Sequence, residues 1–296
     1  MRYGLPYQGS KNQIAEWVIS NLPKAEHFYD LFAGGCAVTH AAMLSGKYQH
    51  FHANDICKQI PQMFLDAING KYKDEKRVIT REDFHKYKDT DPYIALCWSF
   101  GNGKKNYLWN PQTEKIKIAA CKMLAADNLQ ERRKLYMQFI KTLKQELEGG
   151  YNTARLESLQ SLERLQSLNS LQSLERLQSL ERLQSLERLQ SLERLQRLQI
   201  TGVSYDEMEI LPNSVVYCDP PYNTNRPGGY YGATFYHKDF YEWLRQTPFP
   251  VYVSEYEMPS DFVSIASKNK KQLMARYHKE KEKTENIFIH KRFLTL

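Results

Sequence analysis

The chain has 296 residues, a formal net charge of +7, 42% hydrophobic residues and 12% aromatic residues. This is enough apolar material for the core of one large domain or two smaller ones. No run reaches the ~18 apolar residues of a membrane span, and the N-terminus lacks an apolar signal segment, so we expect a soluble, cytoplasmic protein. The five cysteines are scattered without a CxxC pair, which excludes a disulfide framework and a zinc knuckle.

The positive charge fits a partner with a phosphate backbone, although ordinary surface charge would explain it equally well. The segment from Arg155 to Gln199 holds seven Arg and six Glu, so almost all of the excess lies on the rest of the chain.

The first 55 residues predict a strand, a turn, a helix and a second strand. Residues 11–22 have helical spacing, 27–32 predict a strand, 33–35 a tight turn, 37–44 a helix and 48–53 another strand, which ends at Asn54-Asp55. This order is typical of the first unit of a parallel, doubly wound sheet.

Residues 56–150 predict a mostly helical region. Residues 113–147 could form one long helix or two. Residues 98–107 mix Gly, Asn, Lys and aromatics, which suits a loop that contacts nucleic acid or a plain surface turn over a small apolar cluster.

A low-complexity repeat follows. From Leu156 to Leu198 a leucine recurs at every third residue, mostly within the hexapeptide Ser-Leu-Glu-Arg-Leu-Gln. A period of three gives neither a single helical stripe, a heptad seam nor a strand alternation. Two structures remain open, a helical arm with spiralling leucines and a small solenoid of stacked repeats.

The last hundred residues return to a strand pattern. Strands are predicted at 215–218 and 251–253, with a helix at 240–244. Residues 272–277 and 286–290 predict closing strands joined by a solvated turn that contains the charged run 279–283.

Residues 219–222, Asp-Pro-Pro-Tyr, follow the apolar strand 215–218. The Asp219 carboxylate and the Pro220 carbonyl could accept the two hydrogens of an exocyclic amine, the prolines stiffen the turn, and the Tyr222 ring could stack on a flipped base. The alternative is a strand-ending turn with an exposed acid. Cys218 lies within the strand, where a buried thiol is unreactive, so covalent cytosine chemistry is disfavoured.

The turn at Gly34-Gly35 joins a strand to a helix, so a ligand could approach its backbone closely. It is neither GxGxxG nor a Walker motif. Asp55, at the end of the next strand, could bind ribose hydroxyls or cap a helix.

Together these motifs resemble the Dam-type family of DNA adenine-N6 methyltransferases. Residues 7–11 resemble its N-terminal aromatic-x-Gly-Gly/Ser-Lys motif, 30–35 its cofactor glycine loop, 54–56 its ribose-binding acid and 219–222 its catalytic motif. The resemblance implies that S-adenosylmethionine is bound by a set of six residues, namely Tyr7, Lys11, Phe32, Gly34, Asp55 and Asp219. Cys36 follows the glycine pair where the family often has a further glycine.

We therefore expect an α/β, Rossmann-like, S-adenosylmethionine-dependent methyltransferase with an inserted, mostly helical recognition region that contains the hexapeptide repeat. The predicted regions are catalytic (1–58 and 200–296), target-recognition (59–154) and repeat insert (155–199). The predicted reaction is methylation of adenine N6 in double-stranded DNA, catalysed by Asp219, Pro220 and Tyr222 without a metal or a membrane partner. A cognate restriction endonuclease would fit, and no oligomeric state is indicated.

Two rival functions stay open at this point. A cytosine-N4 methyltransferase presents an amine with the same geometry, although those enzymes more often have Ser in place of Asp219. A degenerate methylase that serves as a DNA-binding scaffold would not require the intact acid or Lys11.

Overall fold

The computed structural model describes residues 3–148, 197–222, 235–273 and 280–294. The chain forms two compact units. The first comprises Met1–Leu5, Gly9–Leu65 and Leu192–Leu296, and the second Pro6–Gln8 and Asp66–Ser191. The helical arm or solenoid predicted for the repeat falls outside the described residues except at its last leucine, and the predicted region boundaries stay predictions.

The first unit is built on a seven-stranded sheet in the order β3-β2-β1-β4-β5-β7-β6. Strands β3, β2, β1, β4 and β5 are parallel, whereas β7 runs antiparallel to β5 and to β6. The bounds in chain order are β1 His27–Asp30, β2 His50–Asn54, β3 Leu198–Thr201, β4 Ser214–Cys218, β5 Val251–Glu255, β6 Phe262–Leu273 and β7 Glu280–His290. This mostly parallel α/β sheet agrees with the predicted Rossmann-like fold.

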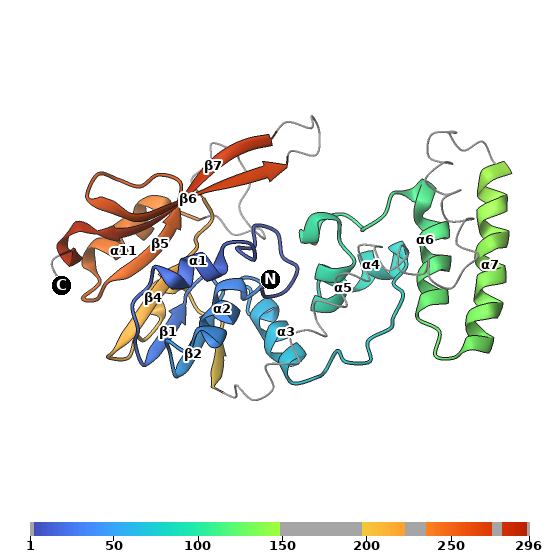
Figure 1. Cartoon of the computed structure of the whole chain (residues 1–296), viewed down its shortest axis with the longest axis horizontal. Helices are drawn as coiled ribbons and strands as arrows, with labels where there is room; N and C mark the ends of the chain where they lie inside the picture. The colour runs from blue at the N-terminus through green and yellow to red at the C-terminus, as the bar shows by residue number, and fades with distance from the viewer. Residues whose placement is uncertain (1–2, 149–196, 223–234, 274–279, 295–296) are drawn as a thin grey trace. The chain divides into compact units, whose positions relative to one another are not determined.

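The central parallel strands are largely buried, as expected for strands covered on both faces, whereas the edge strand β3 has one buried residue. In β4, Val215 to Cys218 are all buried, and β5 is buried throughout. The helices of this unit are α1 Ala15–Ser20, α2 Ala37–Ser45, α3 Gln59–Ile68 (whose last turn belongs to the second unit) and α11 His237–Gln246. Figure 1 shows α2 beside β1 and β2, which it contacts.

The edge strand β3 begins at Leu198, the last leucine of the repeat period. Leu198 is buried and lies in register with Phe51 of β2. The repeat therefore leads directly into the sheet of the first unit.

The closing hairpin differs from the prediction. Strand β6 spans Phe262–Leu273, so it begins ten residues earlier than the strand predicted at 272–277, of which residues 274–277 lie outside the described residues. Residues 280–283 of the predicted solvated turn belong to β7. The register continues to Leu273 opposite Glu280, so backbone pairing with β6 extends through residues 280–283, which the sequence pattern assigned to a turn.

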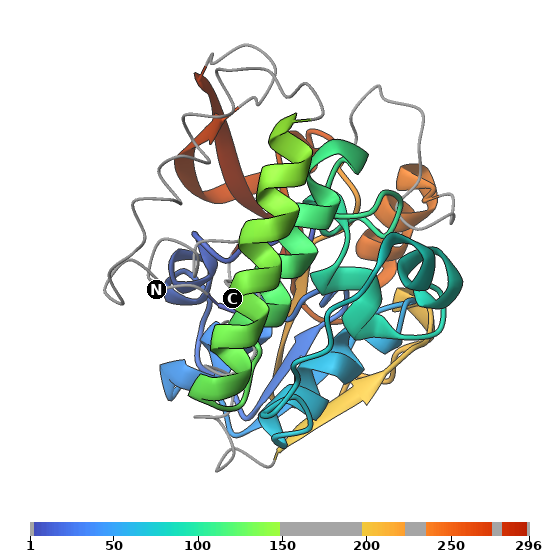
Figure 2. The same cartoon turned by 90° about the vertical axis from the view of Figure 1, so that its right-hand side faces the viewer.

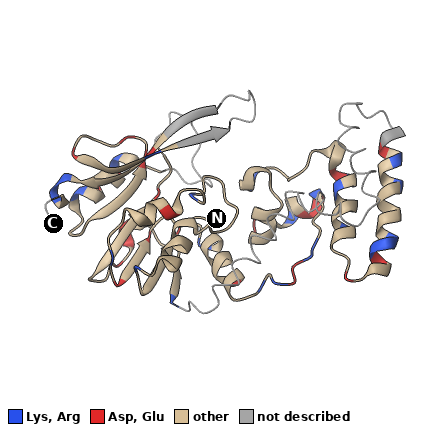
Figure 3. Ribbon diagram, in the orientation of Figure 1, with Lys and Arg blue, Asp and Glu red and all other residues tan. Residues whose placement is uncertain are grey.

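The second unit is helical in its described part, as predicted. Its helices are α4 Arg81–Tyr87, α5 Pro92–Cys97, the 3₁₀ turn η1 Phe100–Asn102, α6 Pro111–Leu124 and α7 Leu129–Glu148. The stretch 113–147 thus contains two helices that pack side by side (Figures 1 and 2) around Ile116, Phe139 and Leu143. Asn110 and Asn128 cap their N-termini. Both helices carry charges of both signs (Figure 3).

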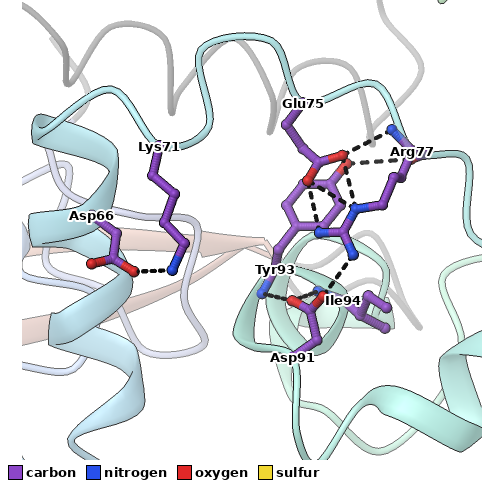
Figure 4. A network of polar contacts seen from close by, with 7 residues as sticks. All are labelled: Asp66, Lys71, Glu75, Arg77, Asp91, Tyr93 and Ile94. Carbon is purple, nitrogen blue, oxygen red and sulfur yellow. Dashed lines mark hydrogen bonds and ion pairs between the residues drawn. The ribbon is translucent and has the colours of Figure 1, made fainter.

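A polar network fixes the start of α5 (Figure 4). The Arg77 guanidinium bonds Glu75 and Asp91 and lies over the Tyr93 ring, 5.0 Å from its centroid. Asp91 also caps α5 by accepting from the backbone N–H groups of Tyr93 and Ile94. The network therefore anchors the helix that leads into residues 98–107.

Residues 98–107 form a turn closed by an antiparallel bridge between Ser99 and Tyr107. Trp98, Tyr107 and Trp109 are buried beneath it, with the two tryptophan rings 5.4 Å apart. At the tip Phe100 is 64% exposed. The small apolar cluster that the sequence suggested is therefore present, and the predicted contact with nucleic acid stays a prediction.

Candidate active site

The strand order reverses between β1 and β4, which lie side by side at the centre of the sheet. In open α/β sheets the crevice at the carboxyl ends of such strands is the usual ligand site. Asp30 is the last residue of β1 and lies in register with Tyr217, and Asp219 directly follows β4. The topology thus brings two carboxylates, far apart in the sequence, to one crevice.

The glycine turn after β1 is held by Asp55 from the end of β2. The backbone N–H of Gly34 donates to Asp55 Oδ2 (2.9 Å), and that of Cys57 donates to Oδ1 (2.8 Å). Gly34 has φ 46° and Cys36 has φ 57°, so a non-glycine residue adopts the left-handed conformation at the start of α2. Asp55 therefore fixes the turn, and it also stands where the sequence predicted a ribose-binding acid.

The N-terminal segment closes over the same turn. The Leu5 N–H donates to Gly35 O (2.7 Å), and the Gly4 N–H donates to His40 Nδ1 (3.0 Å). A Cβ at position 4 would stand 2.4 Å from Gly35 O, and Gly4 has φ +66°. Only glycine can make this approach without a shift of the backbone.

Lys11 joins the N-terminal motif to the Asp-Pro-Pro-Tyr turn. Its Nζ donates to Asp219 Oδ1 (2.7 Å) and lies 3.4 Å from Glu285 Oε1 of β7. The side chains of Lys11 and Glu285 are 7% and 3% exposed and that of Asp219 is 19% exposed, so the ammonium is buried between two carboxylates. This excludes a plain surface lysine.

The charges in this cluster shift one another's ionisation. Burial raises the pKa of Asp219, and the positive charge of Lys11 offsets only part of that rise. Burial alone would lower the pKa of Lys11, but the attraction of Asp219 and Glu285 outweighs it and raises the pKa above its ordinary value. Lys11 therefore stays charged beside an acid that binds its proton more readily than usual.

Tyr222 is held at both its ring and its hydroxyl. The hydroxyl donates to Glu285 Oε1, Lys11 Nζ lies 4.5 Å from the ring centroid, and the Tyr256 ring meets it edge-on at 4.6 Å. The His237 Nε2–H donates to the Pro221 carbonyl (2.7 Å), which ties the turn to the start of α11. The Asp-Pro-Pro-Tyr turn is therefore fixed from several elements.

Asp30 lies buried beneath the glycine turn. Thr39 Oγ1 donates to its Oδ2 (2.7 Å), whereas its Oδ1 is buried without a hydrogen-bond partner among the described residues. Burial, together with the negative charges of Asp219 and Asp55, raises the pKa of Asp30 to about 7. An unsatisfied carboxylate oxygen of this kind is suited to a cationic ligand.

Among the described residues, the predicted site residues form two groups. Gly34 contacts Asp55 in the first group, and Lys11 contacts Asp219 in the second. Tyr222 and the buried Pro220 belong to the second group as well. Phe32 is half-buried and packs on the rings of Tyr205, Phe235 and Phe240. Tyr7 is half-buried and belongs to the second unit.

Sequence reasoning missed Asp30 and Glu285 as members of the site. Asp30 had a signal, because it ends a strand directly before the glycine turn. Glu285 had a weak one, because this acid lies two residues before the apolar run 287–289, in strand alternation with Ile287.

Cys218 is fully buried, and burial raises the pKa of its thiol well above the ordinary value. This agrees with the prediction that it is not a nucleophile. Among the described residues, no group of three His, Cys, Asp or Glu side chains could hold a metal ion, and no helix is long and apolar enough to cross a membrane.

The fold and this group of residues define an α/β protein whose glycine turn and Asp-Pro-Pro-Tyr turn lie at the switch point of a mostly parallel sheet. The family model of D12 class N6 adenine-specific DNA methyltransferases matches residues 7–287, nearly the whole chain. The protein therefore belongs to this family, and it is an enzyme that methylates the N6 amino group of adenine in DNA, as predicted. No curated protein matches the chain in a sequence comparison.

Proposed function

We propose that Asp219, Pro220 and Tyr222 carry the adenine-N6 methylation. The N6 lone pair of adenine is delocalised into the ring, so the free amine is a poor nucleophile. Acceptance of its two hydrogens by the Asp219 carboxylate and the Pro220 carbonyl would localise the lone pair and aim it. Tyr222 would stack on the base once it leaves the duplex.

The chain's own groups suit this task. A pKa raised by burial makes Asp219 a stronger hydrogen-bond acceptor as positive charge develops on the amine, while Lys11 keeps enough of it ionised. The His237 bond to Pro221 and the tyrosine contacts hold the turn still, so most of the rate would come from positioning.

Enzymes of this family use S-adenosylmethionine, which supplies the methyl group on a positively charged sulfur. The residues present fit such a cofactor. The unpartnered Asp30 Oδ1 and the acidic crevice suit its cationic groups, Gly34 exposes backbone at the turn, and Asp55 stands at the end of β2. Lys11, Phe32, Tyr7 and Asp219 complete the proposed cofactor set.

The observation that carries the proposal is the buried contact between Lys11 and Asp219 at the switch point of the sheet. The test is transfer of tritiated methyl groups to unmethylated genomic DNA by the wild type and by Asp219→Ala, with nucleoside analysis of the product. We expect N6-methyladenine from the wild type only. Wild-type transfer by Asp219→Ala, with cofactor binding intact, would refute the assigned role.

We also propose that the substrate is double-stranded DNA and that the turn at 98–107, with exposed Phe100 and two lysines at 104 and 105, contacts it. A cognate restriction endonuclease, the cytoplasmic location and a function of the 155–199 repeat stay predictions. Methylation-aware sequencing of DNA from cells that express the protein would give its recognition sequence.

A further inference from the structure

Glu285 is a buried carboxylate on the antiparallel hairpin, outside the strands that form the switch point. It is 2% exposed, although it follows a run of alternating lysines and glutamates. A buried charge is costly unless it is paired, so its partners indicate why it lies there. Those partners are Lys11 Nζ and the Tyr222 hydroxyl, both within the proposed site.

We propose that Glu285 is a positioning residue for methyl transfer, which acts by fixing the Tyr222 ring and by holding Lys11 between two carboxylates. This inference rests on the proposed function of Asp219 and Tyr222. It adds a third carboxylate to the crevice, supplied by β7 and not by β1 or β4.

The Tyr222 ring is held in place on more than one side. Its hydroxyl is anchored on Glu285 and its edge on Tyr256, while the ammonium of Lys11 lies over it. A ring restrained at these points loses little further freedom when a base stacks on it, because the ordering has occurred before binding. Loss of the Glu285 acceptor would free the ring.

The Lys11 ammonium is shared between two carboxylates. An ammonium has three donors, and here it lies 2.7 Å from Asp219 Oδ1 and 3.4 Å from Glu285 Oε1. Because its charge is divided, Asp219 is less fully neutralised and stays a better acceptor for the incoming amine. Two carboxylates and one ammonium also leave this group with a net negative charge, which favours a positively charged methyl donor.

The competing explanation is that Glu285 only ties the hairpin to the N-terminal segment. The two explanations differ in the pH profile. The groups around Asp219 are Lys11, Glu285, Tyr222, Tyr217, Cys218, Asp30 and Tyr256. The negative charge of Glu285 raises the pKa of Asp219, so its removal shifts the acidic limb of activity to lower pH, an effect that a structural tie would not produce.

The experiment compares Glu285→Gln, Glu285→Ala and Tyr222→Phe with the wild type, by methyl transfer from tritiated S-adenosylmethionine to unmethylated genomic DNA across the acidic range. We expect Glu285→Gln to lower kcat by roughly 10²-fold, because a small misplacement of the reacting group has about this effect. The KM for the cofactor should change less, and the acidic limb should move to lower pH. Glu285→Ala should lose more.

A matched control is Asp261→Asn, which also turns a carboxylate of the closing hairpin into an amide. Asp261 pairs with Arg245 beside the start of β6, so kcat and the acidic limb should stay as in the wild type. Tyr222→Phe removes the same hydrogen bond from the other side. Combined with Glu285→Gln it should lower kcat by less than the product of the two single effects, since the residues act as a unit.

Wild-type kcat and an unmoved acidic limb in Glu285→Gln would overturn the inference. The inference would also be overturned if Glu285→Gln lost activity only in proportion to a lower melting temperature, while the acidic limb of the pH profile stayed where it is in the wild type. If Asp219→Ala also retained activity, the proposed function itself would fail. An inactive Asp219→Ala beside a fully active Glu285→Gln would refute the role of Glu285 alone.

Discussion

Substitution of Lys11 by methionine should destabilise the first unit strongly at neutral pH. Methionine has a similar length and no charge, so the change removes the ammonium and keeps most of the apolar stem. It leaves the Asp219 and Glu285 carboxylates, whose side chains are 19% and 3% exposed, facing each other without their shared cation.

The magnitude follows from the distances. Charges 2.7 Å and 3.4 Å apart attract by about 6 and about 5 kcal/mol at an effective dielectric constant of ~20. Desolvation of the three ions cancels much of this in the folded protein. Removal of one partner from a buried pair nevertheless costs about 3–5 kcal/mol, because an uncompensated charge remains. We expect a loss of that size in the free energy of unfolding.

The loss should depend on pH. Burial already raises the pKa of Asp219 above 3.8, and without Lys11 it rises further. An acid with a raised folded-state pKa contributes stability below its unfolded pKa and loses it as the pH rises through the folded pKa. The difference between wild type and Lys11→Met should therefore be largest at about pH 7 and shrink towards about pH 4.

The measurement is urea unfolding followed by far-UV circular dichroism at several pH values. The control is Lys71→Met, which breaks a pair with Asp66 at 2.6 Å whose lysine is 63% exposed. An exposed pair contributes about 0–1 kcal/mol, so that variant should unfold almost as the wild type does. Equal, small effects of both substitutions at neutral pH would refute the argument from burial, and a loss independent of pH would refute the argument from ionisation.

Further predictions concern the glycine turn and the sheet. Gly4→Ala should lower the free energy of unfolding by at least about 1–3 kcal/mol, because its Cβ would meet Gly35 O and its φ is positive; a thermal melt measures this. Because the pKa of Asp30 is about 7, cofactor affinity measured by calorimetry should rise with pH through that value, and Asp30→Asn should abolish the dependence. Burial first and then the charge of His27 lower the pKa of His52 to about 4, so stability should fall as the pH drops from about 6.5 towards about 4, and it should fall less in His52→Phe; urea unfolding at several pH values measures this.

The sequence predicted four of the five parallel strands, β1, β2, β4 and β5, because those elements are local, whereas β3 at the end of the repeat was not predicted. Within residues 27–46, a short apolar run indicates the strand and Gly34 marks the turn that follows it. Gly46 ends the helix. The Asp-Pro-Pro-Tyr turn could be predicted equally well, because its four residues directly follow strand β4 in the chain.

The hairpin and its role could not be predicted in the same way. An alternating run of lysine and glutamate is typical of solvent exposure, and its place in a strand follows only from the backbone pairing with β6. Glu285 meets Tyr222 across 63 positions, and Lys11 meets Asp219 across 208. A single sequence carries no sign of such pairs apart from motif resemblance.

The distribution of the crevice over the chain explains how the enzyme could tolerate a large insert. Lys11 comes from the N-terminal segment, Asp55 from the end of β2, Asp219 from the end of β4 and Glu285 from β7. Apart from Asp55, which directly follows β2, these residues lie outside the segment between β2 and β3, where the predicted recognition region and the repeat enter the chain. Because β3 pairs only with β2 at the edge of the sheet, changes in the length of the preceding segment need not disturb the switch point between β1 and β4. Strand β4, which Asp219 directly follows, is therefore separated from β3 by β2 and β1 in the sheet.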